Sequence, residues 1–272
     1  IKKYRKKMEN GGRSVTQNIQ NFVKFQPLLR ELVARDIKIK YRRSALGVLW
    51  TLLNPLFMMI VLSVVFSNLF KFDIENFPLY LLSGQVIFNF FNDTTTTSMG
   101  AIISNSSLIK KIYVPKYLFV LSRVFSSFIN LMASFTALML VMMAMRVEMH
   151  WTVILSPIPL LFLVAFSLGI GLILAAITVR FRDIMHLYSV FTTALMYLTP
   201  VIYPMSILPK WLSPIVRANP VTNILIMFRD VMLNGNLPSI SGIIIALIET
   251  VLALGIGLYV FYKNQDQFIL NI

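Results

Sequence analysis

Six long apolar runs constrain this chain more than any other feature of its sequence. They cover residues 45–70, 78–103, 117–145, 152–179, 185–203 and 240–262. A helix rises 1.5 Å per residue, so about 20 apolar residues cross a hydrocarbon core about 30 Å thick. The composition agrees, because 57% of the residues are hydrophobic, whereas ordinary soluble domains have about 45–50%. The sequence therefore predicts an all-α integral membrane protein with six transmembrane helices.

The distribution of charge predicts the orientation. The chain has 25 Lys and Arg against 11 Asp and Glu, and thirteen of the basic residues precede Ala45. With six spans, nineteen Lys and Arg flank the side that holds both termini and five flank the other side. Basic flanks stay in the cytoplasm, so we expect both termini there. A basic segment can bind nucleic acid, but beside a hydrophobic bundle we expect it to meet anionic membrane lipids instead.

The segment before the first run divides into two predicted parts. Residues 1–26 form a basic cytoplasmic leader, and residues 27–44 form an interfacial amphipathic helix with Pro27 near its first turn. Asp36 and Lys40 fall on the apolar arc of this helix, and their spacing of four residues suggests that they pair with each other. At the other end of the chain, residues 263–272 form a short cytoplasmic tail.

Prolines interrupt the chain in and after the apolar runs. Pro204, Pro209, Pro214 and Pro220 cut the segment before the last run into pieces too short to cross a membrane. We expect two short re-entrant helices there, at about 207–218 and 221–233, covered by protein or lining a cavity. Three prolines are predicted hinges, because proline removes a backbone hydrogen bond and kinks a helix. They are Pro55, Pro200 and Pro204.

The sequence offers little for catalysis or metal binding. No cysteine is present, so disulfides, thiolate metal sites and cysteine nucleophiles are excluded. Neither a phosphate-binding GxxxxGK[ST] loop nor a GxGxxG motif occurs, which indicates that this chain does not itself bind ATP in the usual way. His150 and His186 are the only histidines, without HExxH spacing or paired carboxylates. We expect no catalytic residue, no metal site and no cofactor bound by this chain.

Three ionisable residues, Asp93, Arg123 and Glu249, lie inside predicted spans. Charge inside a membrane is costly and marks a candidate functional site. Coupling to ions or protons through Asp93 and Glu249 is one interpretation, and hydrogen bonding to neighbouring helices is the other. The second run is also unusually polar, so its polar side chains should face other helices or a hydrated path. Aromatic rings near these groups could stack on a sugar, although packing against lipid or core is the ordinary role of such rings.

Four segments, in this order and spacing, resemble a known family. The family comprises the permease subunits of bacterial ABC exporters for polysaccharide and polyol phosphate, which move O-antigen, capsule and teichoic acid. The matching segments are LLRELVARDIKIKYRRSALGVLWTLLNPL at 28–56, SLIKKIYVPKYLFVLSRV at 107–124, VRFRDI at 179–184 and YLTPVIYPMSILPKWLSPIVRANPVTNILIMFRD at 197–230. The resemblance implies a multi-pass protein of the bacterial cytoplasmic membrane that moves a lipid-linked glycan or polyol-phosphate polymer.

The resemblance also implies partners. Two copies of this chain would work with two ATP-binding subunits, which would hold ATP and Mg²⁺, so this chain would not be an enzyme. A coupling helix at about 105–115 would dock into the ATPase, with Leu108, Ile109, Ile112 and Tyr113 as its apolar contacts; an ordinary basic loop is the alternative. The full set of expected coupling residues is Ser106, Leu108, Ile109, Lys110, Lys111, Ile112, Tyr113, Arg180, Arg182 and Asp183.

By the same resemblance, the transport path would lie between the two copies and be lined mainly by the first, second and fifth runs. The candidate lining residues are Trp50, Phe57, Phe88, Phe91, Asn92, Tyr197 and Tyr203. Three other functions stay open. They are an ABC exporter of drugs or small lipids with the same fold, a proton-coupled carrier, and a membrane-embedded glycosyltransferase or phosphatase.

Overall fold

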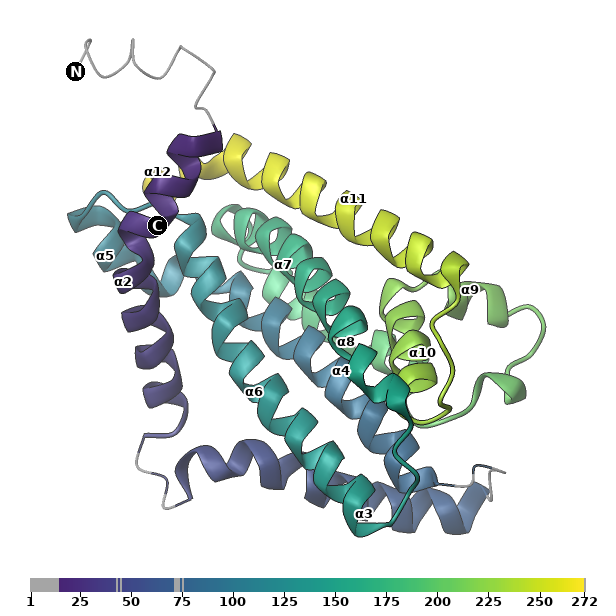
Figure 1. Ribbon diagram of the computed structural model, residues 1–272. Coiled ribbons are helices and arrows are strands. Elements are labelled where there is room, and N and C mark those ends of the chain that lie inside the picture. The colour runs from purple at the N-terminus through teal and green to yellow at the C-terminus, as the bar shows by residue number, and fades with distance from the viewer. Residues whose placement is uncertain (1–14, 43, 45, 71–73, 75, 272) are drawn as a thin grey trace.

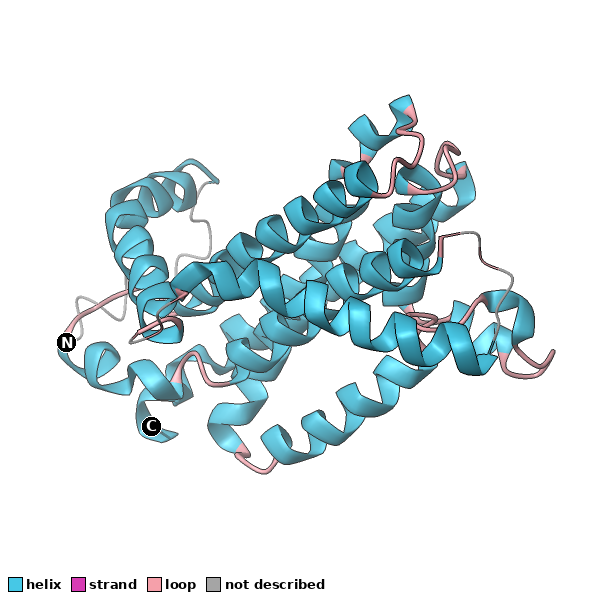
Figure 2. Cartoon of the chain, turned by 90° about the horizontal axis from the view of Figure 1, so that it is seen from below, coloured by secondary structure: helices cyan, strands magenta, loops and turns pink. Residues whose placement is uncertain are grey.

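The computed structural model describes residues 15–42, 44, 46–70, 74 and 76–271. Residues 1–14 of the predicted leader lie outside these ranges. Within the described residues the chain is almost entirely helical and contains no strand (Figure 2). This agrees with the long apolar runs, because a helix satisfies its backbone hydrogen bonds within one segment.

Each predicted run overlaps one long helix. These helices are α3 (Trp50–Phe70), α4 (Phe77–Met99), α6 (Tyr117–Ala144), α7 (Pro157–Arg180), α8 (Ile184–Leu198) and α11 (Ile240–Asn264). Three helical stretches are long and apolar enough to cross a membrane by themselves, namely Tyr117–Ala144, Trp151–Arg180 and Ile240–Leu270. α3 and α8 contain shorter apolar stretches, Trp50–Phe66 and Ile184–Leu198. α8 ends before Pro200, because a residue that precedes proline avoids helical geometry, so the helix is shorter than the predicted run.

The shorter helices differ more from the expectations. They are α2 (Val15–Lys40), α5 (Ser106–Lys111), α9 (Ser213–Arg217), α10 (Pro220–Met232) and α12 (Phe268–Asn271). Pro27 lies inside α2 and not near its start, so one continuous helix crosses the expected boundary between the leader and the amphipathic helix. Pro27 removes a single backbone hydrogen bond there. Between 207 and 218, only the five residues of α9 form an α-helix, whereas α10 matches the second expected piece.

The long helices pack around α4 and α7. α11 lies along α7, α2 lies along α6, and α3 contacts both α4 and α6 (Figure 1). One hydrophobic core joins α4, α6, α7 and α10, and a second core joins α5 to parts of α2, α6, α7, α11 and α12. We call the end of the bundle with α5, the turn between α7 and α8, and the C-terminal residues the α5 end. The end with α9 is the α9 end.

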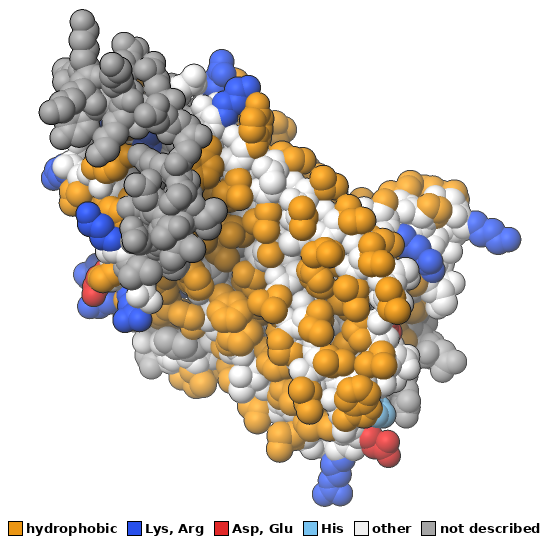
Figure 3. Space-filling view, turned by 45° about the horizontal axis from the view of Figure 1, so that its top comes forward, with side chains coloured by type: hydrophobic (Ala, Val, Ile, Leu, Met, Phe, Trp, Pro, Cys, Tyr) orange, Lys and Arg blue, Asp and Glu red, His pale blue; other side chains and the backbone are white. Residues whose placement is uncertain are grey.

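The surface of the molecule is that of a membrane protein. Figure 3 shows a broad face of hydrophobic side chains, with the Lys and Arg side chains grouped near its margins. On α8 and α11, large apolar residues such as Val190, Val251 and Leu252 are more than half exposed. Soluble monomers rarely expose apolar patches of this extent. Acyl chains or another membrane protein must therefore cover this face.

Small residues allow α7 and α11 to approach closely. A Cβ atom added at Gly169 would lie 2.5 Å from the carbonyl carbon of Ala253 and 2.6 Å from the backbone nitrogen of Leu254. One added at Gly255, also on α11, would meet nothing within 4 Å. Close contact through small residues is a common way to pack membrane helices, because van der Waals contact replaces the hydrophobic effect there.

We expect Gly169→Ala to lower the free energy of unfolding by about 1–3 kcal/mol, because the new methyl group overpacks the contact between α7 and α11. Thermal unfolding of the protein purified in detergent measures the effect. Gly255→Ala is the matched control, since it makes the same change of residue in a helix without a steric clash. Equal melting temperatures for the two variants would contradict the close packing described here.

Candidate functional site

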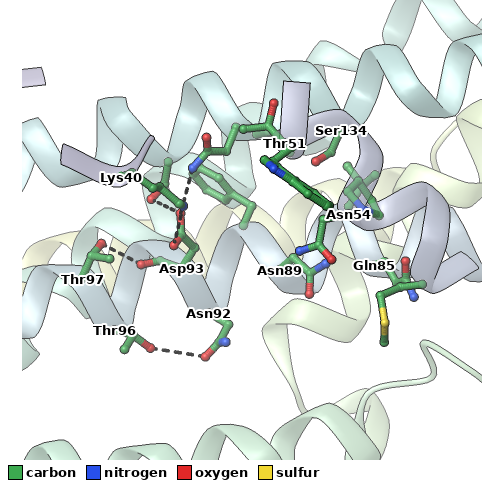
Figure 4. Close-up of a pocket in the computed structure, with 18 of the residues that line it drawn as sticks. Lys40, Thr51, Asn54, Gln85, Asn89, Asn92, Asp93, Thr96, Thr97 and Ser134 are labelled. Atoms are coloured by element: carbon green, nitrogen blue, oxygen red, sulfur yellow. Dashed lines mark hydrogen bonds and ion pairs between the residues drawn. The ribbon is translucent and has the colours of Figure 1, made fainter. Parts of the chain in front are cut away.

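A cavity lined by both polar and apolar side chains opens between α3, α4 and α6 and the end of α2 (Figure 4). Its volume is about 830 Å³. We call it the polar groove. Its lining residues are Lys40, Tyr41, Ser44, Trp50, Thr51, Asn54, Pro55, Met58, Leu62, Gln85, Val86, Asn89, Phe90, Asn92, Asp93, Thr96, Thr97, Ser127, Asn130, Leu131, Ser134 and Met196.

The sequence builds the polar groove from two helical stripes. On α4, polar residues recur at the three- and four-residue spacing that keeps side chains on one helical face. This stripe consists of Gln85, Asn89, Asn92, Asp93 and Thr96. α6 contributes a matching stripe of Ser127, Asn130 and Ser134, and both stripes face the same cavity. Polar groups in a bilayer need polar partners or water. Two stripes that face each other across a cavity provide both for the polar side chains of α4 and α6.

Asp93 is the centre of a hydrogen-bonded cluster in the polar groove. Lys40 Nζ at the end of α2 lies 3.3 Å from both carboxylate oxygens. Ser127 Oγ donates to Asp93 Oδ2 at 2.8 Å, and Asn130 Nδ2 donates to the same oxygen at 3.2 Å. The hydroxyl of Tyr41 donates to Asn130 Oδ1 at 3.1 Å. Asp93 is therefore paired with a cation and forms hydrogen bonds to a neighbouring helix. Of the two interpretations of Asp93, this arrangement matches hydrogen bonding between helices.

Arg123 is also paired with α2. Arg123 Nη1 lies 3.2 Å from Asp36 Oδ2, and Arg35 Nη2 lies 3.0 Å from Asp36 Oδ1. The expected pairing of Asp36 with Lys40 is thus wrong. Asp36 pairs with Arg123 of α6, and Lys40 pairs with Asp93 of α4, because both side chains face the helices of the bundle. We call the Asp36–Arg123 and Lys40–Asp93 ion pairs the α2 contacts.

The candidate path residues do not form one site in this chain. Trp50 and Asn92 line the polar groove. Phe88 and Phe91 are each 3% exposed in the hydrophobic core, where Phe91 stacks on Phe166 with ring centroids 5.9 Å apart. Phe57 and Tyr197 are exposed, and the hydroxyl of Tyr203 donates to the carbonyl oxygen of Tyr197 at 2.8 Å. Of the predicted hinges, Pro55 lies inside α3 at the groove, and Pro200 and Pro204 follow α8. The walls of the groove come mainly from α3, α4 and α6, with only Met196 from α8.

A buried arginine that the sequence reading missed holds the broken chain after α8. Arg229 Nη1 donates to the carbonyl oxygen of Pro200 at 2.7 Å, and Nε donates to Ser83 Oγ at 3.1 Å. Nη2 donates to the carbonyl oxygens of Tyr80 at 2.9 Å and Val201 at 3.1 Å. The guanidinium also lies 3.4 Å from the centre of the Tyr80 ring. We call this group of residues the Arg229 cluster; it ties α10 to α4 and to the segment after α8.

A short helix, α5, lies in the segment 105–115 that was expected to couple to a partner, and the apolar residues of this segment divide into two groups. Ile109 is buried in the second core of this chain, and Leu108 packs against the same core. Ile112 and Tyr113 are 55% and 85% exposed. Only these last two are therefore free to contact a partner within the described surface. The polar members expected beside them divide similarly, since Lys110 and Lys111 are exposed and Ser106 is half-buried.

The C-terminal residues, expected to be a short tail, also pack at the α5 end. Phe268 is 1% exposed and lies edge-on to Phe261, with ring centroids 5.2 Å apart. Lys116 Nζ donates to the carbonyl oxygen of Gln265 and lies 5.6 Å from the centre of the Phe268 ring. Burial lowers the pKa of Lys116, and the nearby Asp266 opposes that shift. Beyond this packed region, Arg180, Arg182 and Asp183 are exposed at the turn between α7 and α8.

Glu249 lies apart from the polar groove. Its Oε1 accepts a hydrogen bond from Asn223 Nδ2 at 3.0 Å. The two residues line a smaller cavity of about 460 Å³ between α9, α10 and the start of α11, together with Arg217 and Asp230. A route for ions that uses both Asp93 and Glu249 would have to join two separate cavities.

The chain is similar to known export permeases over most of its length. A sequence model of the ABC-2 type transporter family matches residues 27–233. The O-antigen export system permease protein RfbA of Myxococcus xanthus is 28% identical over 252 residues, which cover 92% of this chain and 97% of that protein. A protein of the same name from Klebsiella pneumoniae is 27% identical, over 89% and 93% of the two chains. The polysialic acid transport protein KpsM of Escherichia coli is 23% identical, over 88% and 94%.

Proposed function

Since this chain belongs to the ABC-2 type transporter family, we propose that it is the membrane subunit of an ATP-driven exporter that moves a lipid-linked polysaccharide across a bacterial cytoplasmic membrane. The family match over residues 27–233 carries this proposal. The relatives named as O-antigen and capsule exporters favour a polymer over a drug or a small lipid as the substrate.

In the proposed arrangement, α3, α4, α6, α7, α8 and α11 are the six spans, and both termini are cytoplasmic. The α5 end, which carries Lys110, Lys111, Arg180 and Arg182, then faces the cytoplasm, as the preference of basic residues for that side requires. α9 and α10 are re-entrant helices of the outer side. The Arg229 cluster supports this assignment, because it supplies donors for the carbonyl groups that the broken backbone after α8 leaves free.

The proposed exporter contains two copies of this chain and two ATP-binding subunits. ATP and Mg²⁺ are held by the partner subunits, and no covalent step occurs on this chain. Closure of the ATPase pair moves the permeases through contacts at α5, Ile112 and Tyr113, and at the exposed turn that carries Arg180, Arg182 and Asp183. The second core favours such coupling, because Ile109 of α5 packs in the same core as residues of α7 and α11. The polymer passes between the two copies, and Pro55, Pro200 and Pro204 are the points where helices flex.

The proposal is tested by changing the exposed apolar residues that follow α5. We expect Ile112→Asp and Tyr113→Asp each to weaken binding of the ATP-binding subunit at least tenfold, or by about 1.4 kcal/mol, because a carboxylate would be desolvated in an apolar interface. Co-purification from the native host or a co-expressed operon, followed by ATP hydrolysis, measures the effect. Leu237→Asp, at an exposed apolar residue of the α9 end, is the matched control.

Two results would contradict this proposal. If both variants keep the partner subunit at the level of the Leu237→Asp control, α5 is not the coupling helix. If the unchanged protein recovers no ATPase and transport follows the proton gradient, the chain is not an ABC exporter subunit. In that second case Glu249 becomes the residue to study, since its carboxylate has no cation within the described contacts.

A further inference from the structure

The described lining of the polar groove contains one cation and one anion. Among the described residues that line it, Lys40 is the only Lys or Arg and Asp93 is the only Asp or Glu. The two side chains form an ion pair, with Lys40 Nζ 3.3 Å from Asp93 Oδ1. The polar part of the remaining wall is neutral. It consists of the amides Asn54, Gln85, Asn89, Asn92 and Asn130 and the hydroxyls Tyr41, Ser44, Thr51, Thr96, Thr97, Ser127 and Ser134.

Several of these amides have hydrogen-bonding capacity left. Gln85 is 4% exposed, and its Oε1 is buried without a hydrogen-bond partner in the described structure. The Asn89 side chain lies one turn further along α4, and the Asn54 side chain comes from α3 (Figure 4). Neither asparagine side chain makes a hydrogen bond among the described residues. A buried amide oxygen without a partner, as at Gln85, is costly. The exposed amides of Asn54 and Asn89 can exchange hydrogen bonds with a ligand in the groove.

The wall chemistry selects between classes of polymer. Sugar hydroxyls donate and accept hydrogen bonds, as amides do, and the Trp50 ring offers an apolar face for a sugar ring. A polymer with a carboxylate or phosphate on each repeat needs a cation for each anion that leaves water. Lys40 is already paired with Asp93, so each added anion would compete with that carboxylate for the same cation.

We propose that the polar groove binds an uncharged glycan and that the exported polymer is a neutral polysaccharide, not a polyanion such as a polyol phosphate. This inference rests on the proposed exporter function and narrows its substrate class. Amides of α3 and α4 exchange hydrogen bonds with successive sugar hydroxyls, and the pair of Lys40 and Asp93 stays intact while the polymer is bound.

The test compares two probes on the complex of permease and ATPase in lipid nanodiscs. One probe is a polyprenyl-diphosphate-linked tetrasaccharide of mannose, and the other has glucuronic acid at alternate positions on the same lipid. The readout is the probe concentration that gives half-maximal stimulation of ATP hydrolysis. We expect this concentration to be at least about tenfold lower for the neutral probe. Equal or stronger stimulation by the anionic probe would overturn the inference and leave the exporter function standing.

A charge added to the groove provides the second arm. Asn89→Lys should bring the half-maximal concentrations of the two probes closer together, because the added lysine supplies a cation for the glucuronic acid carboxylates. Asn236→Lys adds the same charge on an exposed loop at the α9 end and should leave the difference unchanged. An Asn89→Lys complex that discriminates as strongly as the Asn236→Lys complex would also overturn the inference. If neither probe stimulates the unchanged complex, the proposed polymer export itself fails, and the inference fails with it.

Discussion

Replacing Arg229 with methionine is expected to lower the free energy of unfolding by about 3–5 kcal/mol, because it removes one partner from a buried polar network and leaves the others unsatisfied. Arg229 is 6% exposed, and its guanidinium donates to Ser83 and to three backbone carbonyl groups. Methionine fills a similar volume without any donor. Thermal unfolding in detergent, with the complex and the isolated permease measured side by side, reports the loss.

Two further variants show how much of the loss of stability comes from the hydrogen bonds of Arg229, how much from its charge, and how much from replacing any arginine with methionine. Arg229→Lys keeps the charge but cannot reproduce the planar set of donors, so it should recover only a small part of the loss. Arg217→Met removes an exposed arginine of α9 and should change the melting temperature little. A melting temperature for Arg229→Met close to that of Arg217→Met would show that the Arg229 cluster does not stabilise the fold.

The apolar runs predicted the long helices well, because burial in lipid leaves few alternatives to a helix of about 20 residues. α6 and α11 begin at Tyr117 and Ile240, the residues at which their runs begin. The short elements were harder to predict. Pro27 was expected to start a helix and lies inside one. Between 207 and 218 only the five residues of α9 form an α-helix, with Pro214 in the first turn.

The polar residues show where sequence reasoning reached its limit. The polar side chains of the second run were expected to face other helices or a hydrated path, and Asn89, Asn92 and Asp93 line the polar groove. The four-residue spacing within α2 wrongly paired Asp36 with Lys40, because a pattern within one helix carries no information about the partners on α4 and α6. Arg229 was counted among the basic residues that mark the outer side. The signal that could have identified it is an arginine in an apolar helix that follows a segment broken by Pro200 and Pro204.

The apolar residues of the coupling segment differ in exposure, which the sequence did not predict. The resemblance treated Leu108, Ile109, Ile112 and Tyr113 as one apolar contact for a partner. The C-terminal residues were expected to form a short tail, and Phe268 packs in the core that also buries Ile109. An acidic substitution at Leu108 or Ile109 would therefore disturb this chain's own packing as well as any interface. Ile112 and Tyr113 are the residues at which loss of a partner can be read without that ambiguity.

The α2 contacts lead to the second large prediction. The Asp36 side chain is 4% exposed, and the Arg123 side chain is 21% exposed. Arg123→Met should cost about 3–5 kcal/mol of stability, because it leaves a buried carboxylate with only Arg35 as its ion-pair partner. Asp36→Leu should also destabilise, since Arg123 then lacks its anion. The double variant should recover most of either loss, because apolar residues of similar size can replace a buried ion pair at little cost.

A double-mutant cycle on Asp36 and Arg123, measured by thermal unfolding, gives the coupling free energy between them. Hydrogen exchange of α2 gives an independent readout, because α2 should open locally when its contact with α6 is lost. The same double-mutant cycle on Lys40 and Asp93 is the control, because it measures the coupling free energy of a more exposed ion pair. Those side chains are 48% and 31% exposed, so solvent screens their attraction and the coupling should be smaller. If the losses at Asp36 and Arg123 simply add, the ion pair is not what holds α2 against α6, and the apolar contacts of Leu29 and Leu32 must do so instead.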